Sequence, residues 1–287
     1  MVEKVTIPYL REKAKTGKPI TMMTAYDHLM AQLEDEAGIE IILVGDSLYM
    51  TVLGHDSTLP ARMDTMIEHA EAVRRGAPRA FVIGDMPYMS YQISIEEAIR
   101  NAGRFMKEAR VDGIKLEGGR EVAETIQALT RATIPVMGHL GLTPQSISML
   151  GGFKAQGRSL EAAERIIEDA KILEEAGAFA ILLEAIPAEV GKIITKRSNI
   201  PIIGIGAGPY CHGQLLIVQD MLGLYKSFVP KFVKQYCNLY DIIKEAFKNY
   251  VQDVESRAFP ELNRHCYKME EQDRQELYRR YSTELSS

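Results

Sequence analysis

The sequence predicts an α/β fold, a closed (β/α)8 TIM barrel, because short apolar runs alternate with amphipathic helical stretches. Seven such runs are readable between residues 20 and 225: ITMMTA, IILVGD, AFVIGD, GIKLEG, IPVMGH, FAILLEA and IPIIGIG. This alternation is typical of βαβ units that build a parallel sheet. The number of runs favours a barrel, and we expect the eighth strand in the weaker run GLYKSFV at 223–229. No GxGxxG turn follows the first run, which argues against an open dinucleotide-binding sheet.

The stretches between the strands have helical spacing, and glycines follow several of them. We expect Gly38, Gly76 and Gly177 to adopt the left-handed conformation that ends a helix. Residues 1–19 are predicted to form a short helix that closes the bottom of the barrel. From residue 231 onward the pattern is helical only, beginning with a predicted helix over 231–256.

We assign residues 1–260 to a single barrel domain that includes the N-terminal capping helix and extra C-terminal helices. Residues 261–287 mix charges of both signs and are predicted to be a charged helical or flexible tail.

Composition excludes several classes of function. The 287 residues are 46% hydrophobic and 25% charged, as in an ordinary globular protein, and the net charge of −5 gives no electrostatic reason to expect nucleic acid. No apolar run approaches the roughly 20 residues that span a membrane, and the polar N-terminus does not resemble a signal peptide. Without CxxC spacing, Cys211, Cys237 and Cys266 are expected to be free thiols in a cytoplasmic protein.

Ionisable residues stand at the C-terminal ends of five predicted strands: Asp46, Asp85, Glu117, His139 and Glu184. In a parallel barrel these ends open onto the face that carries the active site. Four acids at one mouth repel each other unless positive charge is present. Lys115 lies two residues before Glu117, on the same face of its strand, and is one candidate for that charge.

A hard divalent cation is the second candidate. Oxygen ligands without nearby cysteine sulfur suit Mg²⁺ better than Zn²⁺, and open positions would accept the two adjacent oxygens of an α-keto acid. The cation would polarise the keto oxygen and favour an enolate, while a carboxylate removes the neighbouring proton. We predict Asp46 and Asp85 as metal ligands and Glu184, which follows the apolar run AILL, as the base.

Longer strings resemble the ketopantoate hydroxymethyltransferase (3-methyl-2-oxobutanoate hydroxymethyltransferase) family, in order from about residue 4 to 268. They are TAYD, LVGDSLYMTVLGHDSTLP, AVRRGAP, GDMPYMSYQ, IKLEGG, GHLGLTPQS, LLEAIP, IGIGAG and PKFVKQY. The resemblance implies a barrel of the phosphoenolpyruvate/pyruvate superfamily type, assembled as a homodecamer. It also implies Mg²⁺-assisted transfer of a one-carbon unit from 5,10-methylenetetrahydrofolate to 3-methyl-2-oxobutanoate, which gives 2-dehydropantoate for pantothenate and coenzyme A biosynthesis.

The resemblance also implies roles for individual residues. Asp46 and Asp85 match the family's metal ligands and Glu117 its third, outer acid, while Glu184 matches the proton acceptor. The residues that match contacts to the keto acid are Asp46, Ser47, Asp85 and Lys115. His139, at a strand end, is an additional candidate for contact with the substrate.

Two departures from the family pattern concern folate affinity or subunit contacts rather than the chemistry. His212 stands where the family usually has an acid, and Ala61-Arg62 stand where it often has Val-Thr. The folate-binding residues, the preferred divalent ion, the rate and regulation, the oligomeric state and the role of the tail are not readable from the residues themselves.

Two other functions stay open at this point. One is a Mg²⁺-dependent carbon–carbon lyase or mutase of the same barrel superfamily, although the lyases typically carry a KKCGH-type loop that this chain lacks. The other is a catalytically inactive, metabolite-binding barrel, against which the complete set of candidate residues argues.

Overall fold

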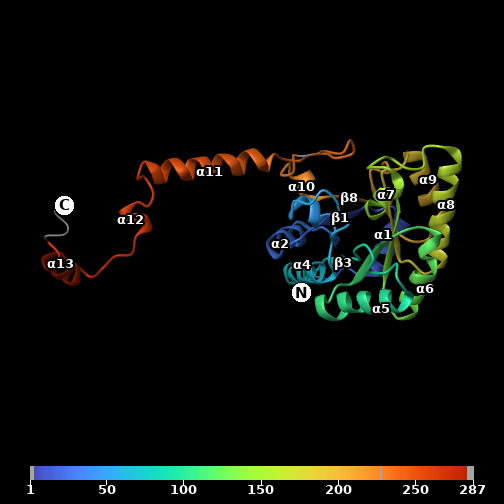
Figure 1. Cartoon of the computed structure of the whole chain (residues 1–287), viewed down its shortest axis with the longest axis horizontal. Helices are drawn as coiled ribbons and strands as arrows, with labels where there is room; N and C mark the ends of the chain where they lie inside the picture. The colour runs from blue at the N-terminus through green and yellow to red at the C-terminus, as the bar shows by residue number, and fades with distance from the viewer. Residues whose placement is uncertain (1–2, 227, 283–287) are drawn as a thin grey trace. The chain divides into compact units, whose positions relative to one another are not determined.

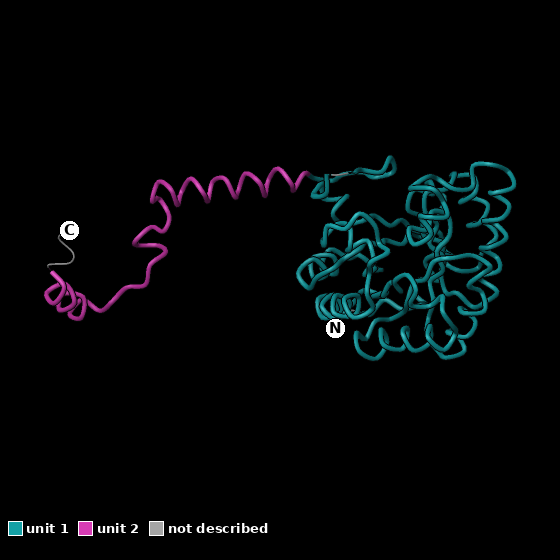
Figure 2. The backbone as a smooth tube through the Cα atoms, in the orientation of Figure 1, with its two compact units in different colours: residues 1–237 teal, residues 238–287 magenta. Residues whose placement is uncertain are grey.

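The computed structural model describes residues 3–226 and 228–282. They form two compact units, residues 1–237 and residues 238–287, coloured teal and magenta in Figure 2. The sequence pattern placed a boundary later, at residue 260.

The first unit is a closed barrel of eight parallel strands in sequence order, in which β8 pairs with β1. The strands are β1 Ile20–Thr24, β2 Ile41–Val44, β3 Phe81–Asp85, β4 Gly113–Glu117, β5 Val136–Gly141, β6 Ala180–Glu184, β7 Ile202–Ile205 and β8 Gly213–Leu216. This architecture confirms the predicted (β/α)8 barrel and its first seven strands.

The prediction for the eighth strand was wrong, because residues 213–216 form it and the described residues of 223–229 carry no strand. Position 227 lies outside the described residues. Gly213 pairs with Ile20 of β1 and Ile203 of β7, so this short segment closes the barrel. The exposed, polar Gln214 interrupts the apolar pattern and hides the strand in the sequence.

Helices surround the strands (Figure 1). They are α1 Ile7–Thr16, α2 His28–Ala37, α3 Leu48–Thr51, α4 Met63–Gly76, α5 Ile95–Arg104, α6 Ala123–Arg131, α7 Ile147–Leu150, α8 Leu160–Glu175, α9 Ala188–Arg197 and α10 Val218–Met221. Val5 and Leu10 pack with the side chains inside the barrel, which confirms that the N-terminal helix closes one end of it.

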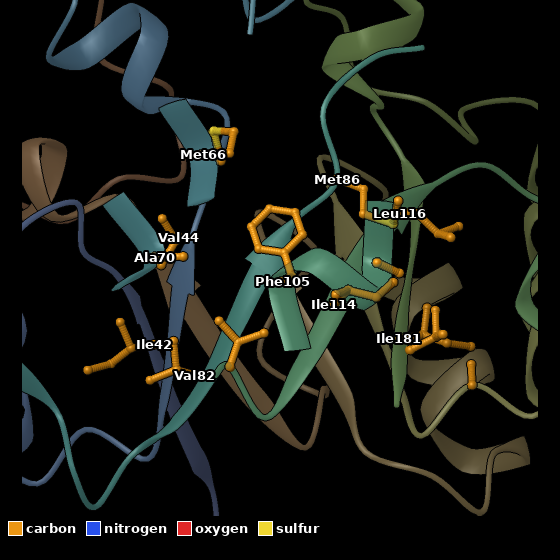
Figure 3. Packing of buried hydrophobic residues seen from close by; sticks show 14 of the residues in the cluster. Ile42, Val44, Met66, Ala70, Val82, Met86, Phe105, Ile114, Leu116 and Ile181 are labelled. Atoms are coloured by element: carbon orange, nitrogen blue, oxygen red, sulfur yellow. The ribbon is translucent and has the colours of Figure 1, made fainter. Parts of the chain in front are cut away.

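The period of two along each strand separates two packing layers. Inward side chains such as Met22, Ile83 and Leu182 form one buried cluster inside the barrel. Outward side chains pack against the helices in a second, larger cluster. Figure 3 shows part of this outer layer, including Val44 and Phe105. The barrel therefore has a filled interior, on which the residues at the mouth rest.

Glycine occupies the predicted helix ends for two different structural reasons. Gly38 and Gly177 have φ of 93° and 104°, as expected for left-handed caps. The prediction for Gly76 was wrong, because this residue is the last of α4 and the cap is Ala77. A Cβ on Gly76 would lie 2.3 Å from the carbonyl oxygen of His28, so close packing of α4 on α2 requires glycine there.

The second unit contains α11 Leu239–Glu255, α12 Leu262–His265 and α13 Glu271–Arg280. Residues 231–238 are not helical, so the predicted helix over 231–256 begins eight residues late, at Leu239. No helix among the described residues is long and apolar enough to cross a membrane.

Candidate active site

The strand period directs the predicted residues into one cavity of about 340 Å³ at the C-terminal mouth of the barrel. Inward positions above the interior cluster carry the ionisable side chains of β3 to β6. All seven candidates from the sequence line the cavity: Asp46, Ser47, Asp85, Lys115, Glu117, His139 and Glu184. The side chain of Glu184 is 17% exposed. The side chains of four other residues of the cavity are almost completely buried: Asp85, Lys115, Glu117 and His139.

Lys115 is the central positive charge of this floor. Its Nζ lies 2.7 Å from Asp85 Oδ1, 3.7 Å from Glu117 Oε1 and 3.4 Å from His139 Nδ1. Burial alone would lower the pKa of Lys115, but the charges of Asp85 and Glu117 outweigh it and raise that pKa. The ammonium therefore stays protonated and offsets part of the acidic charge.

N–H donors hold one oxygen of each acid in the floor. Asp85 Oδ2 accepts from the backbone N–H of Asp46 at 3.0 Å. Asp46 Oδ2 accepts from Gln145 Nε2, and Glu117 Oε2 accepts from the backbone N–H of Gln145, each at 3.0 Å. The carboxylates are thus fixed in orientation before any ligand binds.

The three acids differ in pKa because different sets of charged neighbours act on them: acids on Asp46, Lys115 on Asp85, and both Lys115 and His139 on Glu117. Burial, and then the charges of Asp85 and Glu117, raise the pKa of Asp46 well above its ordinary value. Burial also raises the pKa of Asp85, although Lys115 opposes that rise. For Glu117 burial acts in the same direction, but Lys115 and His139 together outweigh it and lower the pKa.

His139 connects this acidic cluster to the predicted base. Its Nε2 lies 3.1 Å from Glu184 Oε2, and its Nδ1 lies 3.5 Å from Glu117 Oε1. Burial and Lys115 would lower the pKa of His139, but contacts with Glu117 and Glu184 raise it to about 9. The sequence indicated an apolar setting for Glu184; the structure instead places an imidazolium beside it.

The backbone next to the predicted base is unusual. Ala185 has φ of 47°, a left-handed conformation that non-glycine residues rarely adopt. Its N–H donates to the carbonyl of Ile205 at 2.9 Å, which ties the end of β6 to β7. This conformation at the strand end fixes the direction in which the chain leaves Glu184.

Gln145 and Tyr91 are site residues that the sequence reasoning missed. Gln145 Nε2 donates to Asp46 Oδ2 and to the carbonyl of Met86, both at 3.0 Å, while its Oε1 accepts from the Tyr91 hydroxyl at 2.7 Å. The Tyr91 hydroxyl in turn accepts from the backbone N–H of Glu117 at 3.1 Å. Gln145 lies within the quoted string GHLGLTPQS, which is the only signal in the sequence that could have drawn attention to it.

The two departures from the family pattern have structural roles. His212 directly precedes β8, at the end of that strand opposite the mouth, and its Nδ1 accepts from the N–H of Ile202 at 3.1 Å. Ala61 is buried, and the N–H of Arg62 donates to the hydroxyl of Tyr49 at 2.9 Å. Neither position lines the cavity.

The carboxylates of the cavity fit a cation that takes most of its ligands from water and substrate. Among the described residues, no group of three His, Cys, Asp or Glu side chains is arranged to hold a metal ion. Two neighbouring carboxylates, those of Asp46 and Asp85, are what Mg²⁺ uses when water and substrate supply the other oxygens. Asp46 uses Oδ2 for Gln145, so Oδ1 is the atom it offers, while Glu117 faces Lys115 and His139 as an outer acid.

Comparison with known proteins finds relatives that share one enzyme name. A family model described as ketopantoate hydroxymethyltransferase matches residues 4–262. The 3-methyl-2-oxobutanoate hydroxymethyltransferase of Syntrophus aciditrophicus (strain SB) is 56% identical over 258 residues, covering 90% of this chain and 95% of the relative. The protein of the same name from Syntrophomonas wolfei subsp. wolfei is 50% identical over 275 residues, covering 96% of this chain and 99% of the relative.

Solved structures of other proteins share the fold at low identity. A phosphonopyruvate hydrolase complex with oxalate and Mg²⁺ has a TM-score of 0.60 at 16% identity, covering 96% of this chain and 98% of that chain. The 2,3-dimethylmalate lyase, described as a PEP mutase/isocitrate lyase superfamily member, has a TM-score of 0.56 at 15% identity, covering 100% and 94%. These likenesses confirm the predicted barrel fold.

Proposed function

The chain belongs to the ketopantoate hydroxymethyltransferase family, and from this premise we propose that it transfers a hydroxymethyl unit to 3-methyl-2-oxobutanoate. The donor is 5,10-methylenetetrahydrofolate and the product is 2-dehydropantoate, on the route to pantothenate and coenzyme A. The observation that carries the proposal is the meeting of Asp46, Asp85, Lys115 and Glu184 in one cavity.

Binding of the keto acid is assigned to the positive and hydroxyl groups of the floor. Lys115 attracts the anionic substrate, and Ser47, whose Oγ is 2.8 Å from the Tyr26 hydroxyl, offers a hydroxyl at the cavity wall. Asp46 and Asp85 would hold the divalent cation. When bound, Mg²⁺ or a similar ion supplies polarisation of the keto oxygen, which makes the neighbouring C–H bond more acidic.

Glu184 is the proposed base. One of its carboxylate oxygens takes the proton from C3 of the keto acid, the carbon next to the carbonyl. His139 Nε2 lies 3.1 Å from Glu184 Oε2, so a positive charge on the imidazole attracts the carboxylate. C3, which has lost its proton, then forms the new C–C bond to the one-carbon unit. The folate nitrogen is released from that unit, and water supplies the hydroxyl group of the product.

The other properties of the enzyme follow from family likeness. We infer a homodecamer that works in the cytoplasm, with no nucleic-acid or membrane partner. A lyase or mutase is the weaker alternative, because the relatives at 50% and 56% identity are named as hydroxymethyltransferases.

A product assay tests the proposal directly. Purified protein with Mg²⁺, 3-methyl-2-oxobutanoate and methylenetetrahydrofolate should form 2-dehydropantoate, detected by mass, and omission of the folate should abolish its formation. Removal of divalent ions with a chelator should stop the reaction, and added Mg²⁺ should restore it. Folded protein that yields no 2-dehydropantoate would contradict the proposal and favour an inactive barrel, whereas folate-independent cleavage of an α-keto or enolpyruvyl acid would favour a lyase.

A further inference from the structure

The cavity has a second zone above the ionisable floor, with a different chemistry. Two separate segments contribute it, residues 151–158 after α7 and the described residues 223–226 and 228–237 after α10. Its side chains, called the upper wall here, are Phe153, Lys154, Tyr225, Phe228, Lys231 and Phe232. The keto-acid mechanism uses none of them.

The first segment is anchored beside the base. The N–H of Gln156 donates to the carbonyl of Ala185 at 3.0 Å, one residue after Glu184. Gly157 is buried, and a Cβ there would lie 2.9 Å from the side chain of Ile166. Phe153 lies three residues before this anchor with 47% of its surface exposed, an apolar ring held over the mouth without being packed into it.

The second segment is anchored at its C-terminal end, at Phe232 and Tyr236. The ring of Phe232 packs directly on Gly206, where a Cβ would lie 2.5 Å from it. The N–H of Tyr236 donates to the carbonyl of Met221 at 2.9 Å. Phe228, between these anchors and α10, is 63% exposed. Each segment thus presents an adjacent pair of aromatic ring and lysine, Phe153-Lys154 and Lys231-Phe232.

The charges of the two zones are opposite in character. Lys115 in the floor is engaged by acids, whereas neither Lys154 nor Lys231 has an ion-pair partner among the residues that the structure describes. The floor carries more acids than cations and would repel a second anionic ligand. Rings beside unpaired ammonium groups instead fit a flat aromatic ligand that carries carboxylates.

The geometry points to the upper wall as the binding site of the folate co-substrate, an inference that rests on the proposed function. The pterin and aminobenzoyl rings stack against Phe153, Phe228 and Phe232, and the glutamate carboxylates pair with Lys154 and Lys231. This arrangement places the one-carbon unit above the keto acid, on the side where the Gln156–Ala185 hydrogen bond adjoins the base.

Binding measurements with two ligands separate the two parts of this assignment. Tetrahydrofolate and tetrahydropteroate, which lacks the glutamate, are titrated into the Mg²⁺-loaded protein in a calorimeter. The double variant Lys154→Gln/Lys231→Gln should bind tetrahydrofolate about fivefold more weakly, as expected for two exposed ion pairs, and tetrahydropteroate as the wild type does. Phe153→Ala should weaken both ligands roughly tenfold, because the rings are common to both.

A matched control and a folate-independent readout complete the design. Met149→Ala alters a 92% exposed side chain in the same region that does not line the cavity, and it should bind both ligands like the wild type. Exchange of the C3 proton of 3-methyl-2-oxobutanoate in D₂O reports whether the floor of each variant is intact. Unchanged tetrahydrofolate binding by the double variant, or an equal loss for both ligands, would overturn the assignment of the lysines, and unchanged binding by Phe153→Ala would overturn that of the rings. Wild-type protein that makes no 2-dehydropantoate would instead count against the proposed function.

Discussion

Glu117 and Glu34 are both buried glutamates of the barrel unit, yet their surroundings are opposite. Glu117 accepts a backbone N–H of Gln145 and lies within 4 Å of Lys115 and His139, and these cations lower its pKa although burial opposes them. Glu34, on α2, is 6% exposed, and neither carboxylate oxygen has a hydrogen-bond partner among the described residues. Burial, with a contribution from Asp27, raises its pKa to about 9.

The difference shows that burial by itself gives a neutral acid, and that a cation must be built in to keep a buried acid charged. The mouth of the barrel meets this condition with Lys115, which the strand period places beside Asp85 and Glu117. A bound cation would do the same for Asp46 and Asp85, whose pKa values burial raises. Glu34 has no such partner and therefore carries a proton at neutral pH.

Removing the cation of the mouth should have the largest effect on stability. Lys115→Met leaves Asp85 and Glu117 buried without their partner, which should lower the free energy of unfolding by about 3–5 kcal/mol in urea denaturation. Lys171→Met, which removes an exposed pair with Glu175, is the control and should change it by less than about 1 kcal/mol. If Lys115→Met lowered the free energy of unfolding as little as the control does, the contrast drawn between Glu117 and Glu34 would be contradicted.

Removing the N–H donors of Gln145 should have an intermediate effect. Gln145→Glu keeps the shape but places an acceptor against Asp46 and the carbonyl of Met86, at a cost of about 1–3 kcal/mol in unfolding free energy. Its KM for the keto acid should rise as Asp46 loses its orientation. Gln156→Glu is the matched control, because among the described residues the Gln156 side-chain amide donates a hydrogen bond only to the carbonyl of Lys154, and it should leave both quantities nearly unchanged. Equal behaviour of the two variants would contradict the role of Gln145.

The third expected effect is a pH dependence at Glu34. The unfolded glutamate titrates near 4.5 and the folded one near 9, so between these values the folded state holds one more proton. Stability contributed by this proton is therefore lost as pH rises, by at most about 1.4 kcal/mol per pH unit. Glu34→Gln removes this dependence. As pH rises from 6 to 8, the urea midpoint of the variant should therefore rise relative to that of the wild type. Parallel pH curves for the two proteins would show that Glu34 is not neutral.

The position of the ionisable floor could be predicted because it depends on a local rule. Asp85, Glu117 and Glu184 each end a strand, and the period of two with parallel strands sends them to one mouth. Gln145 and Tyr91 could not be found in this way. They lie on connecting segments, and their contacts reach 99 residues along the chain to Asp46 and 26 residues to Glu117.

Errors in the predicted fold have equally specific causes. The strand at 213–216 has only four residues and an exposed polar Gln214, so the pairing that closes the barrel identifies it and its own pattern does not. Gly76 was predicted as a cap because caps commonly are glycines, but the contact of α4 with His28 is what requires it. Both features depend on tertiary neighbours that a local pattern does not contain.

Proton exchange at C3 of 3-methyl-2-oxobutanoate is the measurement that tests the account most directly. With Mg²⁺ in D₂O and without folate, the wild-type protein should replace the C3 hydrogen by deuterium, observed by NMR. Glu184→Gln should slow this exchange by about 10²–10⁴-fold, the range of a general base, while the protein still binds the keto acid. Exchange by Glu184→Gln at the wild-type rate, or no exchange by folded wild-type protein, would contradict the assignment of Glu184 as the base.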